Sequence, residues 1–267
     1  MFPLGKQPKV TRDLVGVNTD VQKLSVDGET KNIELLGKLK IKELWVFAVN
    51  QEQFDNIMTH VNPELLYVYK MRVENLSILQ MMSNLREVYL CWNTKSTDLW
   101  NFSYNKNLTY LLIEDFSKLE DLTPIKDGGN LGGLYLGGGI TKALNVKTLE
   151  PISDLVRLNE LTLMNIKVQD HSLEPLMNLK RLKKLNISNQ FPMEEYAKLS
   201  VVLQNTECEF FKPYVRMEST EGKDIMMTGR KRPCLNSKKD VEKIRKYEQK
   251  FKKVQEEFRK KSNEFCN

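Results

Sequence analysis

The sequence predicts an α/β solenoid: a curved stack of short repeats with a parallel β-sheet on the concave face, short helices and turns on the convex face, and a helix at the C-terminus. Three observations support this prediction. One apolar pattern recurs along most of the chain, the segments between its copies carry apolar residues at three-residue spacing, and residues 236–267 have the periodicity of an amphipathic helix. With 267 residues, 40% of them hydrophobic, the chain can bury a large core.

The recurring pattern is apolar-x-x-apolar-x-apolar. It occurs eight times, with starts 20, 22, 22, 23, 23, 27 and 24 residues apart, and a weaker ninth copy starts at Asn205. Each copy can bury its apolar face only against its neighbours, so the copies are expected to stack. The eight copies are VQKLSV from Val21, IKELWV from Ile41, PELLYV from Pro63, LREVYL from Leu85, LTYLLI from Leu108, LGGLYL from Leu131, LNELTL from Leu158 and LKKLNI from Leu182.

The segments between the copies predict short helical turns. In SKLEDLTPIKDGG the apolar residues Leu119, Leu122 and Ile125 are three apart, and KTLEPISDLVR and HSLEPLMNLKR repeat this spacing. With these features the chain resembles the leucine-rich-repeat proteins with short, about 22-residue, internalin-type repeats. The resemblance covers about Val21 to Phe211, and it implies strands on the concave side with helical turns on the convex side.

Two departures from that pattern predict irregular coils. The family places an asparagine three residues after the second strand leucine, and only Asn93 fits, so the asparagine ladder should be largely missing. The 27-residue step around residues 140–147 predicts a bulging loop. The asparagine column contains Glu29, Val49, Met71, Asn93, Phe116, Gly139, Ile166 and Gln190.

The stretch LGGLYLGGGI, residues 131–140, contains five glycines but lacks the spacing of a dinucleotide-binding or P-loop motif. We therefore interpret it as the strand of the sixth repeat. Gly133 and Gly137 are expected to leave space beside Tyr135, where the backbone of a partner could approach closely.

Two columns of side chains are expected to point outward from the concave face, because strand side chains alternate. The first starts at Lys23 and the second at Asp27. Their N-terminal half is rich in aromatic residues, which dominate the binding energy of protein interfaces. The alternative is that the rings only cover one another or meet the N-terminal arm. The candidate partner-binding residues are Trp45, Phe47, Tyr67, Tyr69, Tyr89, Tyr110 and Tyr135.

The C-terminal segment predicts a basic helix with Ser237 as N-cap and Asp240 at N3. Residues 230–267 hold 14 Lys/Arg and 6 Asp/Glu, whereas the whole chain has 41 and 35, so the net charge of +6 resides in this tail. We expect its apolar seam to cap the solenoid or the helix to stay solvated. Pairing with another helix, as in a homodimer, and binding of its lysines to nucleic acid or an anionic membrane are the alternatives. The seam consists of Ile244, Tyr247, Phe251, Val254 and Phe258, with Phe265 further on.

The predicted organisation has four parts. Residues 1–20 form an N-terminal cap and residues 21–204 the repeats. Residues 205–235 form a C-terminal cap strand and loop, and residues 236–267 form the helix.

No catalytic residue, metal ligand or cofactor site is predicted. His171 is flanked by Asp170 and Ser172, but three consecutive residues cannot converge as a triad, and Ser172 or Asp170 is expected to cap the following turn. His60 lies in a loop between repeats. The four cysteines lack metal-ligand spacing, and they are Cys91, Cys208, Cys234 and Cys266.

These features together predict a non-enzymatic module that binds another protein, of unknown identity, through its concave aromatic face, as an inhibitor, immunity protein or scaffold. The alternative is an adaptor for nucleic acid or a membrane surface that acts through the basic helix. No signal peptide and no apolar run of about 18 residues is found, so a cytoplasmic location with reduced thiols is expected.

Overall fold

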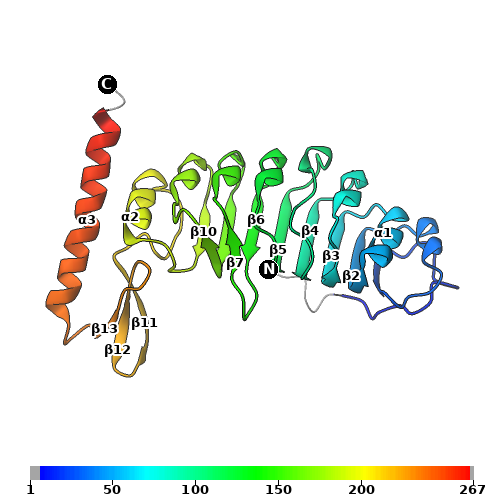
Figure 1. The fold of residues 1–267 in the computed structure, drawn as a ribbon, viewed down its shortest axis with the longest axis horizontal. Coiled ribbons are helices and arrows are strands. Elements are labelled where there is room, and N and C mark those ends of the chain that lie inside the picture. The colour runs from blue at the N-terminus through cyan, green and yellow to red at the C-terminus, as the bar shows by residue number, and fades with distance from the viewer. Residues whose placement is uncertain (1–6, 265–267) are drawn as a thin grey trace.

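The computed structural model describes residues 7–264 and shows a curved solenoid whose repeats place eight parallel strands in one sheet (Figure 1). The register joins equivalent positions of successive repeats, for example Leu24 with Leu44 and Leu44 with Leu66. The predicted fold class is confirmed. The strands in spatial order are β1 (Lys23–Asp27), β2 (Glu43–Asn50), β3 (Leu65–Arg72), β4 (Glu87–Asn93), β5 (Tyr110–Phe116), β6 (Gly133–Gly137), β8 (Glu160–Met164) and β10 (Lys184–Ile187).

Short helices line the other side of the solenoid (Figure 1). The second repeat has a regular helix, α1 (Gln51–Thr59), which starts with a reciprocal capping box. The Asn50 side chain accepts from the Gln53 backbone N–H, while the Gln53 side chain accepts from the Asn50 N–H. Single 3-10 turns serve other repeats, at Ile33–Lys38, Ser77–Met81, Phe102–Tyr104, Thr123–Asp127, Glu150–Ile152 and Glu174–Asn178.

The repeated apolar positions form one continuous core between the sheet and these helices. Leu44, Leu66, Val88 and Leu111, which occupy the same position in four repeats, are all completely buried. Each such side chain contributes roughly 1.5–3 kcal/mol relative to an exposed one. Stacking of identical positions therefore stabilises a chain whose single repeats could not fold alone.

The asparagine ladder is missing, as predicted, and apolar packing takes its place. Asn93 is buried, donates to the Val73 carbonyl at 2.8 Å and accepts from the Lys95 N–H at 2.9 Å. At the equivalent position in neighbouring repeats Met71 and Phe116 are buried in the core.

A residue with left-handed backbone geometry lies one or two residues before the end of each of strands β2 to β5. The four residues have φ between 52° and 62°, although none is glycine. Such a residue reverses the alternation of the strand, so its own side chain turns outward while the following side chain enters the core. These residues are Ala48, Lys70, Trp92 and Asp115.

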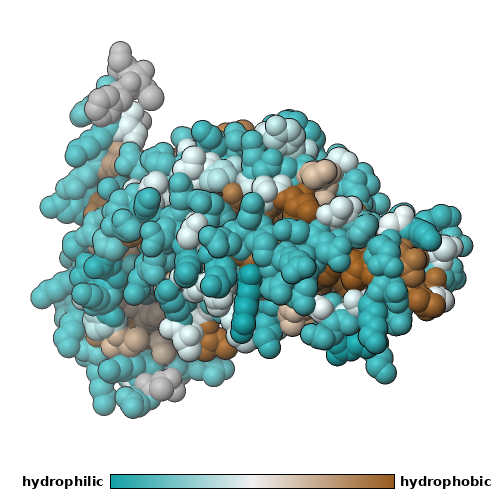
Figure 2. All heavy atoms as spheres, turned by 45° about the vertical axis from the view of Figure 1, so that its right-hand side comes forward, coloured by the Kyte–Doolittle hydropathy of each residue, from teal (hydrophilic) through white to brown (hydrophobic). Residues whose placement is uncertain are grey.

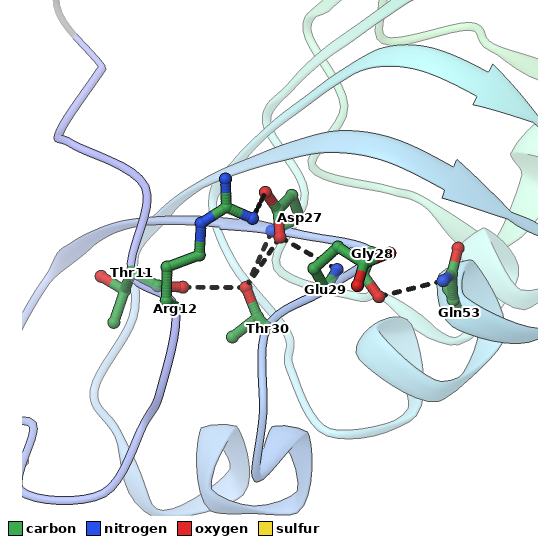
Figure 3. A network of polar contacts seen from close by, with 7 residues as sticks. All are labelled: Thr11, Arg12, Asp27, Gly28, Glu29, Thr30 and Gln53. Atoms are coloured by element: carbon green, nitrogen blue, oxygen red, sulfur yellow. Dashed lines mark hydrogen bonds and ion pairs between the residues drawn. The ribbon is translucent and has the colours of Figure 1, made fainter.

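A polar network closes the N-terminal edge of the sheet (Figure 3). Arg12 forms an ion pair with Asp27, and the Thr30 hydroxyl donates to the Thr11 carbonyl at 2.8 Å. Leu14 packs into the main core beside this network. Residues 10–14 therefore cover the first repeat by hydrogen bonds at the edge and by one apolar contact.

The loop of the sixth repeat bulges, as the 27-residue step predicts. Ile140 at its tip is fully exposed, and the loop returns through β7 (Leu144–Val146), which pairs in parallel with β9 (Ile166–Val168). A Cβ atom on Gly138 would lie 2.5 Å from the Asn165 carbonyl oxygen and 2.6 Å from the Leu144 nitrogen. Only glycine permits this close approach of backbone to backbone.

A small antiparallel sheet, which the sequence analysis missed, occupies most of residues 205–235. Its strands are β11 (Tyr214–Thr220), β12 (Lys223–Met227) and β13 (Cys234–Leu235). Both turn residues between β11 and β12, Glu221 and Gly222, have positive φ, which is the geometry of a two-residue type I′ hairpin. Of the predicted cap strand only a single bridge remains, between Glu207 and Lys184.

The C-terminal helix is shorter than predicted at its start. Helix α3 (Val241–Glu264) begins five residues after residue 236, and Ser237 is not its N-cap. The Ser237 hydroxyl instead donates to Asp224 at 2.6 Å, which ties the segment to β12. Phe265, the last apolar residue of the predicted seam, lies outside the described residues.

Helix α3 docks on the last repeat, alongside α2 (Met193–Val202) (Figure 1). Phe251 is 3% exposed and belongs to the main core, and Ile244 packs on the small sheet. Lys250 pairs with Glu194 at 2.9 Å. The seam thus caps the solenoid, and a homodimer through the same seam would require α3 to leave α2.

Candidate interaction surface on the concave face

The strand register aligns the predicted outward residues into columns. Trp45, Tyr67 and Tyr89 are register partners, and the column continues through Leu112 and Tyr135. Its first member is Ser25, which pairs with Trp45; the expected Lys23 pairs with Glu43 instead. The correction follows from the pattern itself, because Ser25 lies between the apolar residues of its strand.

The aromatic side chains of the columns form one cluster of rings. Phe47 and Tyr67 have centroids 6.1 Å apart, Tyr67 and Tyr89 are 6.3 Å apart, and Tyr89 and Tyr110 are 5.3 Å apart. All three pairs are tilted. Each such pair contributes about 0.5–1.5 kcal/mol beyond its buried area. The cluster is therefore a second, smaller core on the concave side of the sheet.

Three of the seven candidate binding residues are buried, which corrects the expectation that all seven are exposed. Trp45 and Tyr67 are each 1% exposed and Tyr89 is 6% exposed. Parallel strands lie only about 4.8 Å apart, so large rings on adjacent strands cover one another. The other four keep accessible surface: Phe47, Tyr110 and Tyr135 are half-buried, and Tyr69 is 39% exposed.

The hydroxyl groups of the cluster are held in their neutral form. Tyr89 donates to the Glu87 carboxylate at 2.6 Å, and Tyr135 donates to Glu114 at 3.1 Å. Burial, together with these carboxylates, raises the pKa of Tyr89 and of Tyr135 above the ordinary value of 10. Burial also raises the pKa of the Cys91 thiol to about 12, so this buried cysteine is not a thiolate nucleophile near neutral pH.

The glycines of the sixth strand make room for the protein's own rings. A Cβ atom on Gly137 would lie 2.7 Å from the Tyr135 ring, and one on Gly133 would lie 2.5 Å from the Tyr110 ring. Both glycines are buried. The space expected for a partner's backbone beside Tyr135 is therefore already filled.

An exposed aromatic pair stands at the edge of the cluster. Tyr69 and Trp92 meet edge to face with centroids 5.7 Å apart, and the Lys70 ammonium lies 5.7 Å from the centre of the Trp92 ring. Trp92 is 40% exposed. Figure 2 shows hydrophobic patches over the N-terminal half of the molecule, whereas the surface of α3 is mostly hydrophilic.

Trp92 escaped the sequence analysis because strict alternation places it in the core, beside Val88 and Leu90. Its left-handed backbone, with φ of 58°, turns the side chain outward instead. The recurrence of an outward residue two positions after the second strand apolar residue in four repeats is visible only once the backbone is known.

The C-terminal half of the concave face is polar and hollowed. Asn186 donates to the Thr162 hydroxyl at 3.3 Å, in the columns where the N-terminal half has rings. A groove of about 640 Å³ opens here, lined by both residues and by the exposed Met164.

The polar residues around His171 form a local turn. His171 is exposed, and the neighbouring Ser172 acts as a turn cap, because its hydroxyl accepts from the Glu174 N–H at 3.1 Å and its N–H donates to Asp170 at 3.0 Å. The expectation for Ser172 and Asp170 is thus confirmed. Among residues 7–264 no group of three potential ligand side chains is placed to hold a metal ion.

The cysteines and the hydropathy of the helices add two findings. Cys91, Cys208 and Cys234 are free thiols, and Cys266 lies outside the described residues. In the part of the chain that the structure describes, no helix combines the length and the apolar character needed to cross a membrane.

The repeat register, the concave parallel sheet and the convex turns identify the architecture. It is a leucine-rich-repeat solenoid. A scan against protein-family models finds no match, and a search of curated proteins finds no relative.

Solved structures with a similar fold include two internalins from Listeria monocytogenes. One aligns at 17% identity and a TM-score of 0.44 over 70% of this chain and 60% of its own, and internalin C2 aligns at 18% and 0.40 over 64% and 70%. A leucine-rich-repeat protein from Leptospira interrogans aligns at 16% and 0.46 over 71% and 59%. The chain therefore spans about 60% of the length of two of these proteins.

Proposed function

We propose that the chain is a non-enzymatic protein-binding module that holds its partner against the N-terminal half of the concave face. The observation that carries this proposal is the exposed pair of Tyr69 and Trp92 with Lys70 beside it. Tryptophan and tyrosine are the residues most enriched among interface hot spots, where each contributes about 2 kcal/mol or more. The two exposed rings pack edge to face against each other, so part of their conformational freedom is already lost before a partner binds.

The backbone at Trp92 turns its ring towards solvent. A bulky residue in the left-handed region costs roughly 1–2 kcal/mol relative to glycine. Trp92 bears this cost while 40% of the residue stays exposed. Ala48, Lys70 and Asp115 share this geometry, so what distinguishes Trp92 is the aromatic ring that its backbone turns outward.

The candidate residues then divide into two roles. Tyr69, with the accessible edges of Phe47, Tyr110 and Tyr135, contacts the partner together with Trp92 and Lys70. Trp45, Tyr67 and Tyr89 form the buried cluster against which Phe47, Tyr110 and Tyr135 pack. A cytoplasmic location and a role as inhibitor, immunity protein or scaffold belong to the same proposal.

Capture of partners from a lysate of the source cells, quantified by mass spectrometry, tests the proposal. The bait is the whole chain, compared with a Tyr69→Arg, Trp92→Arg double variant. Tyr104→Arg is the matched control, because Tyr104 is 60% exposed on a convex 3-10 turn. We expect the double variant alone to lose a partner while its circular dichroism stays unchanged. Equal capture by all three baits would contradict the proposal.

A further inference from the structure

A groove of about 720 Å³ lies away from the concave cluster, on the flank of the last repeats. Strand β9 forms one side, and residues 189–191 with the turn at residues 229–232 form the other. Ile166 and Val168 of β9 are buried in the core, whereas Lys167 between them is exposed. The strand therefore offers the groove a side chain and not a backbone edge.

The second side of the groove is held in place by its backbone. The Gly229 N–H donates to the Asn189 side chain at 2.6 Å. The next N–H along the chain, that of Arg230, donates to the Phe191 carbonyl at 2.8 Å. A Cβ atom on Gly229 would lie 2.8 Å from the Cβ of Met193, so glycine lets the turn pack tightly against the start of α2. The side chains of the turn are thus presented from an anchored backbone.

Three consecutive basic residues form this turn, and they divide between two surfaces. The guanidinium of the last one, Arg232, lies 5.6 Å from the centre of the Tyr247 ring of α3. Arg230 and Lys231 line the groove instead, across from Lys167. Within the described chain none of these three groove cations forms an ion pair or a side-chain hydrogen bond.

The charge of this groove is one-sided. Glu120 is the one acidic residue among the described residues that line it. The concave groove of about 640 Å³ instead has Glu207 and Glu209 against Lys212, and a groove of about 490 Å³ beside the bulging loop has three acidic residues and three lysines. Positive charges that surround one hollow without compensation attract negatively charged groups.

The side chains that carry these charges are accessible. Lys167 and Lys231 are exposed and Arg230 is half-buried. A guanidinium presents its N–H donors in a fixed plane, which matches the two oxygens of a carboxylate. The groove can therefore take up a carboxylate without any rearrangement of its backbone.

Neutral hydrogen-bonding groups complete the groove. The side chains of Gln169, which is exposed, and Gln190, which is half-buried, line it. Among the described residues neither side-chain amide has a hydrogen-bond partner. An amide both donates and accepts, as the backbone of a peptide does. Cations together with free amides match a peptide with acidic side chains better than they match a small inorganic anion.

We propose that this groove binds an acidic segment of a partner protein. The carboxylates of the segment pair with Lys167 on one side and with Arg230 and Lys231 on the other. Gln169 and Gln190 hydrogen-bond to its backbone. The volume of the groove lies within the range of about 300–1,000 Å³ that is usual for ligand sites. The site is separate from the aromatic surface, so the two proposals stand or fall independently.

The probe is an acetylated and amidated pentapeptide, GEEEG, titrated into the whole ¹⁵N-labelled protein at low salt. We expect the backbone amide signals of Lys167 and Lys231 to shift together with the side-chain amide signals of Gln169 and Gln190. The peptide GQQQG has the same length but no charge. It should bind at least about tenfold more weakly, because its side chains form no ion pairs with the groove.

Charge reversal on the protein gives the second readout. Arg230→Glu with Lys231→Glu should weaken GEEEG binding at least about tenfold. Lys167→Glu, on the opposite side, changes an exposed residue and should weaken binding about threefold, which keeps the test decisive if the double variant does not fold. Lys38→Glu with Lys126→Glu, on convex turns, changes the net charge as much as the double variant does and should alter affinity less than about twofold.

Three results would overturn the proposal. The first is absence of GEEEG binding to the unmodified chain. The second is equal affinity for GEEEG and GQQQG. The third is equal weakening by the groove variants and the convex variant, because the peptide would then respond to the overall charge of the protein and not to this groove.

Discussion

The two halves of the eight-stranded sheet share one backbone register but differ in the size of their outward side chains. In β2 to β4 the column holds Trp45, Tyr67 and Tyr89, whose rings fill the concave surface. In β8 and β10 it holds Thr162 and Asn186, which leave a groove of about 640 Å³. The same scaffold thus yields a filled, rigid aromatic face and a hollow polar one.

On the aromatic half, the close packing that makes the surface rigid also reduces the exposed area of its rings. Three of the seven rings that the sequence marks as binding residues bury each other, whereas a fourth, Tyr69, stays exposed beside Trp92. On the hollow half, space is left for a partner to enter. The following experiments test whether the two halves behave as separate units.

Phe251→Ala should have the largest effect, because this ring is 3% exposed between α3 and the last repeat. We expect the local free energy of unfolding to fall by about 3 kcal/mol, measured by hydrogen exchange of α3 amides. All three tryptophans, Trp45, Trp92 and Trp100, lie in the N-terminal half. Denaturation followed by tryptophan fluorescence should therefore show a smaller decrease in the free energy of unfolding than α3 exchange does.

Phe258→Ala is the control for Phe251→Ala, since Phe258 is only half-buried on the same helix face and should cost less. If Phe251→Ala lowered the free energy of unfolding equally by α3 hydrogen exchange and by tryptophan fluorescence, the two halves would unfold as one unit. That result would contradict the idea that they behave separately.

Alkaline pH should destabilise the aromatic half. Burial raises the pKa of the Tyr89 and Tyr67 hydroxyls above 10 and that of the Cys91 thiol from 9 to about 12. These groups keep their protons in the folded state when the unfolded chain has lost them. The free energy of unfolding should therefore stay level below about pH 9 and fall as pH rises towards 12.

Urea denaturation followed by tryptophan fluorescence at several pH values measures this fall. Tyr89→Phe removes one of the titrating groups, so its curve should fall less steeply than that of the unmodified chain above pH 10. A stability that does not change between pH 9 and 11 would contradict the assignment of these hydroxyls to a dry cluster.

The left-handed residues near the C-terminal ends of the strands allow a smaller test. Ala48 has φ of 52° and is exposed, so Ala48→Gly should raise the free energy of unfolding by about 0.5–1 kcal/mol by relieving the backbone. Ala197→Gly, in the interior of α2, should lower it by at least about 1 kcal/mol. If Ala48→Gly lowered the free energy of unfolding, the left-handed geometry that Ala48 shares with Trp92 would carry no backbone cost. The argument that Trp92 bears such a cost would then be wrong.

The smallest expected effect is that of salt concentration on the affinity for the partner. Contacts through Tyr69 and Trp92 should change affinity less than about threefold between 50 and 200 mM salt, because little net charge is neutralised. Binding of nucleic acid through the α3 lysines would instead weaken by about a thousandfold or more. Lys252→Glu with Lys253→Glu should leave partner affinity unchanged. A loss of partner affinity in this variant would favour the basic-helix alternative.

The sequence predicts the fold well because the core repeats a simple pattern, and positions such as Leu44, Leu66 and Val88 follow it without exception. It predicts the site less well for two physical reasons. Burial of Trp45 depends on contacts between adjacent strands, which no single strand shows. Exposure of Trp92 depends on a left-handed backbone that alternation cannot anticipate.

The small sheet was missed for a third reason. The hairpin turn at Glu221 and Gly222 is a short local signal in a segment with weak alternation.

Hydroxyl-radical footprinting of the complex with the captured partner tests the central claim most directly. Oxidation of Trp92, Tyr69 and Tyr104 would be compared between the free and the bound chain. The account predicts strong protection of Trp92 and Tyr69 with no change at Tyr104. Unchanged oxidation of Trp92 in a saturated complex would show that the partner binds elsewhere and would contradict recognition through the aromatic half.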